Sequence, residues 1–181
     1  PVNPASIDAI ILTHAHLDHS GYIPLLVKQG FKGKIYCSDA TFDLCKILLP
    51  DSGFIQEEDA ARANRYNYSK HSPALPLYTE EDAENSLKFF YPVNFGNPHY
   101  INDDLHFTFS RSGHILGSAF ITLSANKKTI VFSGDLGRAK DDVMVEPAKL
   151  QDADYIVIES TYVDRLHKKT DPAEELGQII N

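Results

Sequence analysis

The chain of 181 residues lacks several features that would place it in a specialised class of protein. It has only two cysteines, Cys37 and Cys45, too few for a disulfide framework, so we expect a reducing compartment and a cytoplasmic location. No apolar run approaches the roughly 18 residues that a membrane helix needs, so we expect no membrane partner.

Positive charge is also scarce. Lys and Arg number 17 against 25 Asp and Glu, for a net charge of −8. This balance argues against a protein that holds nucleic acid mainly through a broad basic surface. It does not exclude an enzyme that binds phosphates through metal ions. The remaining composition, 43% hydrophobic and 23% charged, is typical of a soluble globular domain.

The first part of the chain alternates apolar segments of strand and helix character. Residues 9–12 form a short β-branched run typical of a buried strand, and residues 22–27 show a helical pattern. Residues 34–37 predict a second strand, and Asp39 can cap a following helix that we expect to end at Pro50. This alternation predicts a layered α/β architecture.

The middle of the chain is more polar and then changes its period. Residues 56–68 predict a solvated helix, residues 71–77 an extended connection, and residues 79–82 a capping box that opens a helix to about residue 88. Alternation with period two then predicts three strands and a hairpin turn, followed by a last buried strand. These segments are residues 105–110, 119–123 and 129–132, the turn 125–128, and the strand 155–158.

The strongest chemical signal follows the first strand, where His14, His16, Asp18 and His19 lie within six residues. Imidazole nitrogen and carboxylate oxygen suit zinc or a similar divalent ion. Residues two apart in an extended segment point the same way, so His14 and His16 can share one ion, while Asp18 and His19 face a second. A loop whose histidines merely cap the next helix would explain one of these residues, but poorly all four.

Two later strands also end in candidate ligands. His114 follows the strand 105–110 and Asp135 follows the strand 129–132, each directly after a glycine that allows a sharp turn. They would add a third imidazole for one ion and a carboxylate able to bridge two.

Together these six residues resemble the ligand set of the metallo-β-lactamase superfamily in its dinuclear hydrolase form. The resemblance implies an αβ/βα sandwich with the metals at one edge of its two sheets. It also implies that His14, His16 and His114 bind one zinc ion. Asp18 and His19 would bind a second, and Asp135 would bridge the two.

The resemblance narrows to the β-CASP branch of RNA- and DNA-processing nucleases, near bacterial and archaeal relatives of the mRNA 3′-end cleavage nuclease. It implies RNA as substrate, with single-stranded DNA as the lesser choice. The segments that carry it are 13–24, 76–79, 112–119, 132–138 and 159–162. One departure is Val163, where the branch often has glycine.

Parts of that branch have no counterpart here, namely the opening strands, the inserted β-CASP domain and the closing segment. We therefore expect residues 1–181 to be an internal, partial metallo-β-lactamase domain. Its parts would be a first half (1–50), a connecting helical region (51–100), a second sheet (101–163) and the start of a following segment (164–181). His167 lies too close to Glu159 to supply the last ligand of the second ion.

The implied reaction is hydrolysis of RNA phosphodiester bonds by water activated between two zinc ions. Asp18 and Asp135 would act at the reaction centre, and Glu159 would fix a histidine of the absent part. The alternative for Glu159 is a solvated carboxylate at a strand end. The isolated chain should hold one zinc ion or none firmly, show little activity, and self-associate through exposed sheet edges.

Two other functions fit less well. A small-molecule hydrolase of the same fold, acting on a thioester, lactone or phosphoester, would share the six ligands but usually not the segment 159–162. A non-catalytic scaffold subunit would tend to lose ligands, whereas all six are retained here.

Overall fold

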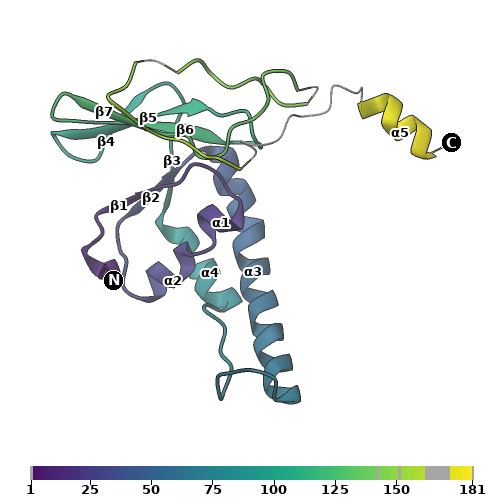
Figure 1. Cartoon of the computed structure of the whole chain (residues 1–181). Helices are drawn as coiled ribbons and strands as arrows, with labels where there is room; N and C mark the ends of the chain where they lie inside the picture. Colours follow the sequence, from purple (N-terminus) through teal and green to yellow (C-terminus); the bar gives the residue numbers. More distant parts are fainter. Residues whose placement is uncertain (1, 142, 151, 162–171, 181) are drawn as a thin grey trace.

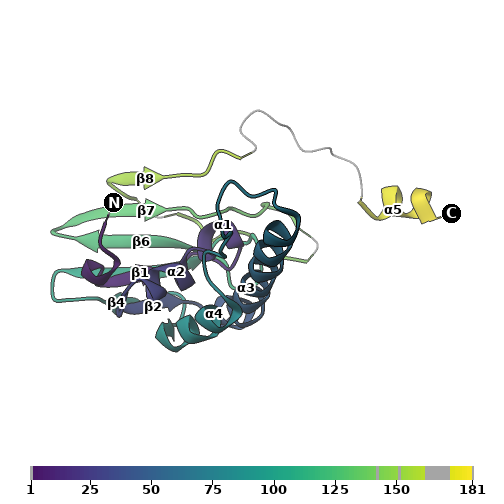
Figure 2. The ribbon, with the colours of Figure 1, turned by 90° about the horizontal axis from the view of Figure 1, so that it is seen from below.

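The computed structural model describes residues 2–141, 143–150, 152–161 and 172–180 (Figure 1). Two sheets lie one against the other, with helices below the first (Figures 1 and 2). The first sheet contains β1 (Ala9–Ile11), β2 (Lys34–Cys37) and β3 (Phe90–Pro92). The second contains β4 (Pro98–Tyr100), β5 (Leu105–Arg111), β6 (Ala119–Ala125), β7 (Lys128–Phe132) and β8 (Tyr155–Val157). The helices are η1 (Pro4–Ser6), α1 (Leu17–Ser20), α2 (Ile23–Lys28), α3 (Asp39–Tyr66), α4 (Glu80–Ser86), η2 (Leu87–Phe89) and α5 (Pro172–Ile180).

The first sheet is parallel and is covered by helices on its outer face. β2 lies at its centre, with β1 and β3 at its edges. Ile35 and Cys37 of β2 are fully buried in one core with Phe31, Cys45 and Leu49 from the helical side. Because burial removes water from the thiols, the pKa of Cys37 is raised and that of Cys45 rises to about 12. The two cysteines are therefore buried apolar residues.

The second sheet is antiparallel from β4 to β7 and takes β8 in parallel at its edge. Its inner face contributes the fully buried Phe107 and Phe109, which pack in a second core with Tyr36 of β2. Asn126 and Lys127 adopt positive φ in the turn between β6 and β7, as a two-residue hairpin requires. Two sheets, a core between them and a helical layer confirm the expected mixed α/β architecture.

The prediction that a helix ends at Pro50 was wrong. α3 runs for 28 residues, from Asp39 to Tyr66, with Pro50 inside it. Its N-cap is Ser38, whose Oγ accepts a hydrogen bond from the Thr41 amide at 3.2 Å, so Asp39 is the first helical residue. A proline inside a helix costs about 3 kcal/mol, and tertiary contacts of the second half of α3 oppose that cost.

Those contacts join α3 to the connection that precedes α4. Tyr78 is buried, and its Oη donates to Ser52 Oγ at 2.9 Å. The Asn64 side chain donates to the Ala74 carbonyl at 2.9 Å and accepts from the Ala74 amide at 2.7 Å. These bonds require residues 51–66 to be helical, a constraint that local sequence does not contain.

Two strands in the connecting region 51–100 were not predicted, and each contains a proline. β3 includes Pro92 and β4 includes Pro98, and both strands lie at the edge of a sheet. An edge strand tolerates proline because the missing amide donor can face away from the ladder. Proline therefore hid both strands from sequence reasoning.

The expectation of a buried last strand was also wrong. Among the described strands β8 pairs with β7 alone, and Tyr155, Ile156 and Val157 are each more than 50% exposed. An apolar β-branched run predicts a strand, but its burial depends on what packs against it. In the described part of the chain, no helix covers this edge, and α5 lies apart from both sheets (Figure 2). None of the described helices is both long and apolar enough to cross a membrane.

Gly53 provides a test of the packing between α3 and α4. A Cβ on Gly53 would lie 2.7 Å from backbone atoms of Thr79 and Glu80. Alanine normally stabilises a helix interior relative to glycine, but here the overlap should reverse the sign. We expect Gly53→Ala to lower the free energy of unfolding by about 1 to 2 kcal/mol in urea titrations. The matched control is Gly177→Ala in α5, where a Cβ meets no heavy atom within 4 Å. A Gly53→Ala variant as stable as the native chain would contradict this packing.

Candidate metal centre

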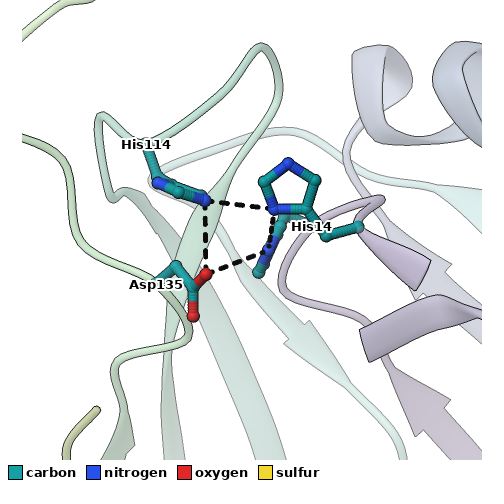
Figure 3. Close-up of side chains that lie close together, drawn as sticks. His14, His114 and Asp135 are labelled. Atoms are coloured by element: carbon teal, nitrogen blue, oxygen red, sulfur yellow. Dashed lines mark hydrogen bonds and ion pairs between the residues drawn. The ribbon is translucent and has the colours of Figure 1, made fainter. Parts of the chain in front are cut away.

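The candidate ligands follow strands of the two sheets, in loops or in the short helix α1, and Figure 3 shows His14, His114 and Asp135 close together. His14 and His16 follow β1, and His19 lies in α1 directly after them. His114 lies between β5 and β6, and Asp135 follows β7. The segment after the first strand thus supplies three imidazoles and the Asp18 carboxylate, and the second sheet supplies one imidazole and one carboxylate.

The loop after β1 is held from both sides. Ala15 is fully buried, and its carbonyl accepts a hydrogen bond from Ser20 Oγ at 2.9 Å. The Thr13 carbonyl accepts from the amide of Ala119, the first residue of β6, at 2.9 Å. This last bond joins the two sheets directly beside the histidines.

Four ligand atoms converge on one point. His16 Nδ1 lies 3.1 Å from His14 Nε2 and 3.1 Å from His114 Nε2. Asp135 Oδ2 lies 3.2 Å from His114 Nε2 and 3.7 Å from His14 Nε2 (Figure 3). One ligand atom from each of these residues lies within 4.8 Å of all the others. Three imidazoles and a carboxylate at this spacing can hold a divalent cation such as zinc.

The other carboxylate oxygen of Asp135 faces a different group. Its Oδ1 lies 3.3 Å from His19 Nε2, which in turn lies 3.5 Å from Asp18 Oδ2. Asp135 is therefore placed between two sets of side chains, with one oxygen directed at each. The structure brings together all six residues that the sequence singled out for metal binding.

His14 is fully buried at the centre of this cluster, so its imidazole is held neutral. Burial, and then the neighbouring imidazoles of His19, His16 and His114, lower the pKa of His14 to about 3. Its Nδ1 lies 3.1 Å from Thr13 Oγ1, leaving Nε2 directed at the cluster. A neutral imidazole with one nitrogen directed inward is the form that binds a metal ion.

Glu159 lines a hollow shared with His19 and Asp135. Its Oε1 accepts a hydrogen bond from the Leu136 amide at 2.6 Å, and its own amide donates to Ser133 Oγ at 3.0 Å. Partial burial raises the pKa of Glu159, but hydrogen bonds from Leu136 and Thr161 outweigh it and leave the pKa below its usual value. Glu159 is thus a carboxylate that braces the Asp135 loop. Tyr162, Val163 and His167 lie outside the described residues.

Sequence reasoning missed the hydroxyl of Ser118, which supports the loop of His114. Ser118 Oγ accepts hydrogen bonds from the amides of His114 and Ile115 at 3.0 and 3.1 Å. The signal in the sequence is a serine four residues after a candidate ligand, and by itself that spacing has no specificity. The remaining histidines, His71, His99 and His106, lie outside the cluster.

The chain is similar to known proteins over most of its length. A sequence model described as the metallo-β-lactamase superfamily matches residues 2–177. The chain is 34% identical over 166 residues to Ribonuclease TTHA0252 of Thermus thermophilus, covering 92% of this chain and 34% of that protein. It is 34% identical over 181 residues to the transcription termination factor FttA of Lokiarchaeum sp., covering 97% of this chain and 26% of the factor. An RNase J-like protein of Methanocaldococcus jannaschii is 34% identical over 163 residues, covering 89% of this chain and 33% of that protein. The chain thus spans about a third or less of the length of these relatives.

The low pKa of His14 predicts acid sensitivity of the metal-free chain. The unfolded chain takes up a proton at this position near pH 6.5, whereas the folded chain does so only near pH 3. Between these values the unfolded state binds more protons, so stability falls as pH falls, by at most about 1.4 kcal/mol per pH unit from this group. His14→Asn should flatten the dependence of unfolding free energy on pH, measured by urea titration in the presence of a chelator. The exposed His71→Asn variant should retain the slope of the native chain, and equal slopes in all three proteins would refute the prediction.

Proposed function

This chain belongs to the metallo-β-lactamase superfamily, and we propose that it forms the metal-binding part of a ribonuclease that hydrolyses phosphodiester bonds of RNA with two zinc ions. The observation that carries the proposal is the placement of Asp135. Its two oxygens face different groups, His114 and His14 on one side and His19 on the other.

The residues fit a pair of divalent ions. His14, His16 and His114 would hold one ion, and Asp18 and His19 would contribute to the second, with Asp135 shared. Among the described residues the second position has only these three side chains. A structural zinc site takes four protein ligands, whereas a catalytic site leaves a position open for water or substrate. When bound, two such ions would lower the pKa of a water between them and neutralise charge on the phosphoryl group.

The side chains around the centre divide the remaining tasks. The Asp18 side chain is 77% exposed while its Oδ2 lies close to His19. It can therefore accept a proton from water at the mouth of the site. His14 stays neutral and buried, and Glu159 holds the Asp135 loop through the Leu136 amide.

The choice of RNA as substrate rests on the relatives and on one segment. Their names describe a ribonuclease, a transcription termination factor and an RNase J-like protein. The segment 159–162, by which the chain resembles the β-CASP branch, begins with Glu159 beside the candidate centre. The net charge of −8 fits an enzyme in which metal ions supply the positive field.

The proposal has two further parts, a location for the parent protein and the self-association of this chain. A cytoplasmic location agrees with the two buried, free cysteines of this chain. Self-association of this chain would use the exposed edge of β8, where apolar side chains and unused backbone groups lie together.

Metal binding can be measured on the chain itself. We expect elemental analysis after zinc loading and dialysis to give no more than one zinc ion per chain, because among the described residues the second position has only Asp18 and His19 besides Asp135, which it would share with the first ion. His16→Ala removes the nitrogen that lies 3.1 Å from two other ligands and should abolish tight binding. The control His71→Ala should retain the native zinc content. Two firmly bound ions in the native chain, or unchanged binding in His16→Ala, would contradict this assignment.

Activity is to be tested with the full-length protein that contains this chain. With zinc or manganese present, we expect cleavage of end-labelled RNA, reduced more than about 100-fold by His16→Ala, since changes in outer-shell partners alone cost about 10- to 100-fold. His71→Ala should remain active. Hydrolysis of thioesters, lactones or phosphomonoesters without any cleavage of RNA would replace the proposal with a small-molecule hydrolase, and cleavage unchanged in His16→Ala would refute the metal site as its origin.

A further inference from the structure

Two buried hydroxyls at the start of α3 hold the loop that contains His114. Ser38 Oγ donates a hydrogen bond to the Gly117 carbonyl at 2.7 Å, and Thr41 Oγ1 donates to the same carbonyl at 3.0 Å. Ser38 is 3% exposed and Thr41 is fully buried. A carbonyl oxygen has two lone pairs, so it can accept both bonds.

Gly117 lies directly on the first turn of α3. Its φ is +79°, and a Cβ at this position would lie 2.5 Å from the Thr41 amide nitrogen and 2.7 Å from Ser38 Oγ. Only glycine combines this backbone conformation with so close an approach. The position of the Gly117 carbonyl is therefore defined by the helix and not by the loop alone.

The loop transmits this position to His114 over a few residues. Ser118 Oγ accepts bonds from the amides of His114 and Ile115, and the Ser118 amide donates to the Ile115 carbonyl at 3.0 Å. Residues 114–118 are thus a closed, internally bonded turn. Displacing Gly117 would displace the His114 imidazole with it.

The contact also joins the two halves of the candidate centre. α3 follows β2 of the first sheet, whose β1 leads into His14 and His16 (Figure 1). His114 belongs to the second sheet. The hydroxyls of Ser38 and Thr41 therefore form a second link between the two sheets close to the ligands, in addition to the bond between Thr13 and Ala119.

We propose that Ser38 and Thr41 are positioning residues that set the zinc affinity of the centre by holding the Gly117 carbonyl, and thereby His114, in register with His14 and His16. The inference rests on the proposed metal centre. Neither hydroxyl is among the candidate ligands, so both act only through the geometry of the loop. Partners that orient a ligand from outside the coordination shell change metal affinity by about 10- to 100-fold when they are removed.

The test uses Thr41→Val, which keeps the shape of the side chain and removes the hydroxyl. Zinc affinity is measured by competition with a chromophoric chelator, and the visible absorption of the cobalt(II)-loaded chain reports coordination geometry. We expect Thr41→Val to weaken zinc binding about 10-fold or more and to change the cobalt(II) spectrum. Thr41→Ser, which restores a hydroxyl, should recover most of both.

A matched control separates positioning from general stability. Tyr78→Phe also removes one buried hydroxyl bonded to α3, the donor to Ser52 Oγ, but at a place outside the candidate centre. It should lower resistance to urea while leaving zinc affinity and the cobalt(II) spectrum unchanged. Thr41→Val with native affinity and a native spectrum would overturn the inference, as would an equal loss of affinity in Tyr78→Phe. Failure of the native chain to bind zinc at all would instead overturn the metal centre, and this inference with it.

Discussion

Four ligand atoms can converge only if two sheets are held in register at one edge. His14 and His16 leave the first sheet, whereas His114 and Asp135 leave the second. A shift of one sheet by a single residue, about 3.3 Å, would be as large as the distances of 3.1 to 3.7 Å between neighbouring ligand atoms. The core of Tyr36, Phe107 and Phe109 between the sheets and the backbone bond from Ala119 to Thr13 prevent such a shift. The chemistry of the centre therefore depends on packing that has no chemical function of its own.

Electrostatics reinforce this dependence. Several imidazoles lie within hydrogen-bonding distance, so they cannot all carry a proton without repulsion. Burial of His14 and the presence of its neighbours hold it neutral, and Asp135 supplies negative charge beside it. The cluster therefore offers a cation neutral nitrogen and anionic oxygen ligands at one place. In the proposed ribonuclease the metal ions, and not the side chains, would provide the positive field for a phosphate. An acidic chain is therefore compatible with a phosphate substrate.

The local patterns predicted much of the fold. Apolar runs and the capping box located β1, β2, α2 and the start of α4, and alternation located the hairpin of β6 and β7. They failed where local and tertiary forces disagree. Pro50 should end a helix, yet bonds from Tyr78 and Ala74 keep the next four turns helical. The run at Tyr155 forms a strand as expected, but its exposure is a property of neighbours that a strand pattern does not specify.

The candidate site shows the same division. The sequence by itself determined which side chains could bind metal, because imidazole and carboxylate groups, the ligands that suit zinc, follow three of the predicted strands. It also indicated that His14 and His16 act together, since residues two apart in an extended segment share a direction. Only the tertiary structure decided that the two oxygens of Asp135 face different groups, that His14 is buried enough to stay neutral, and that Ser38 and Thr41 support the loop of His114. These facts depend on contacts between segments far apart in the sequence, such as Ser38 and Gly117, which are 79 residues apart. The chain acquires these contacts when its two sheets pack together.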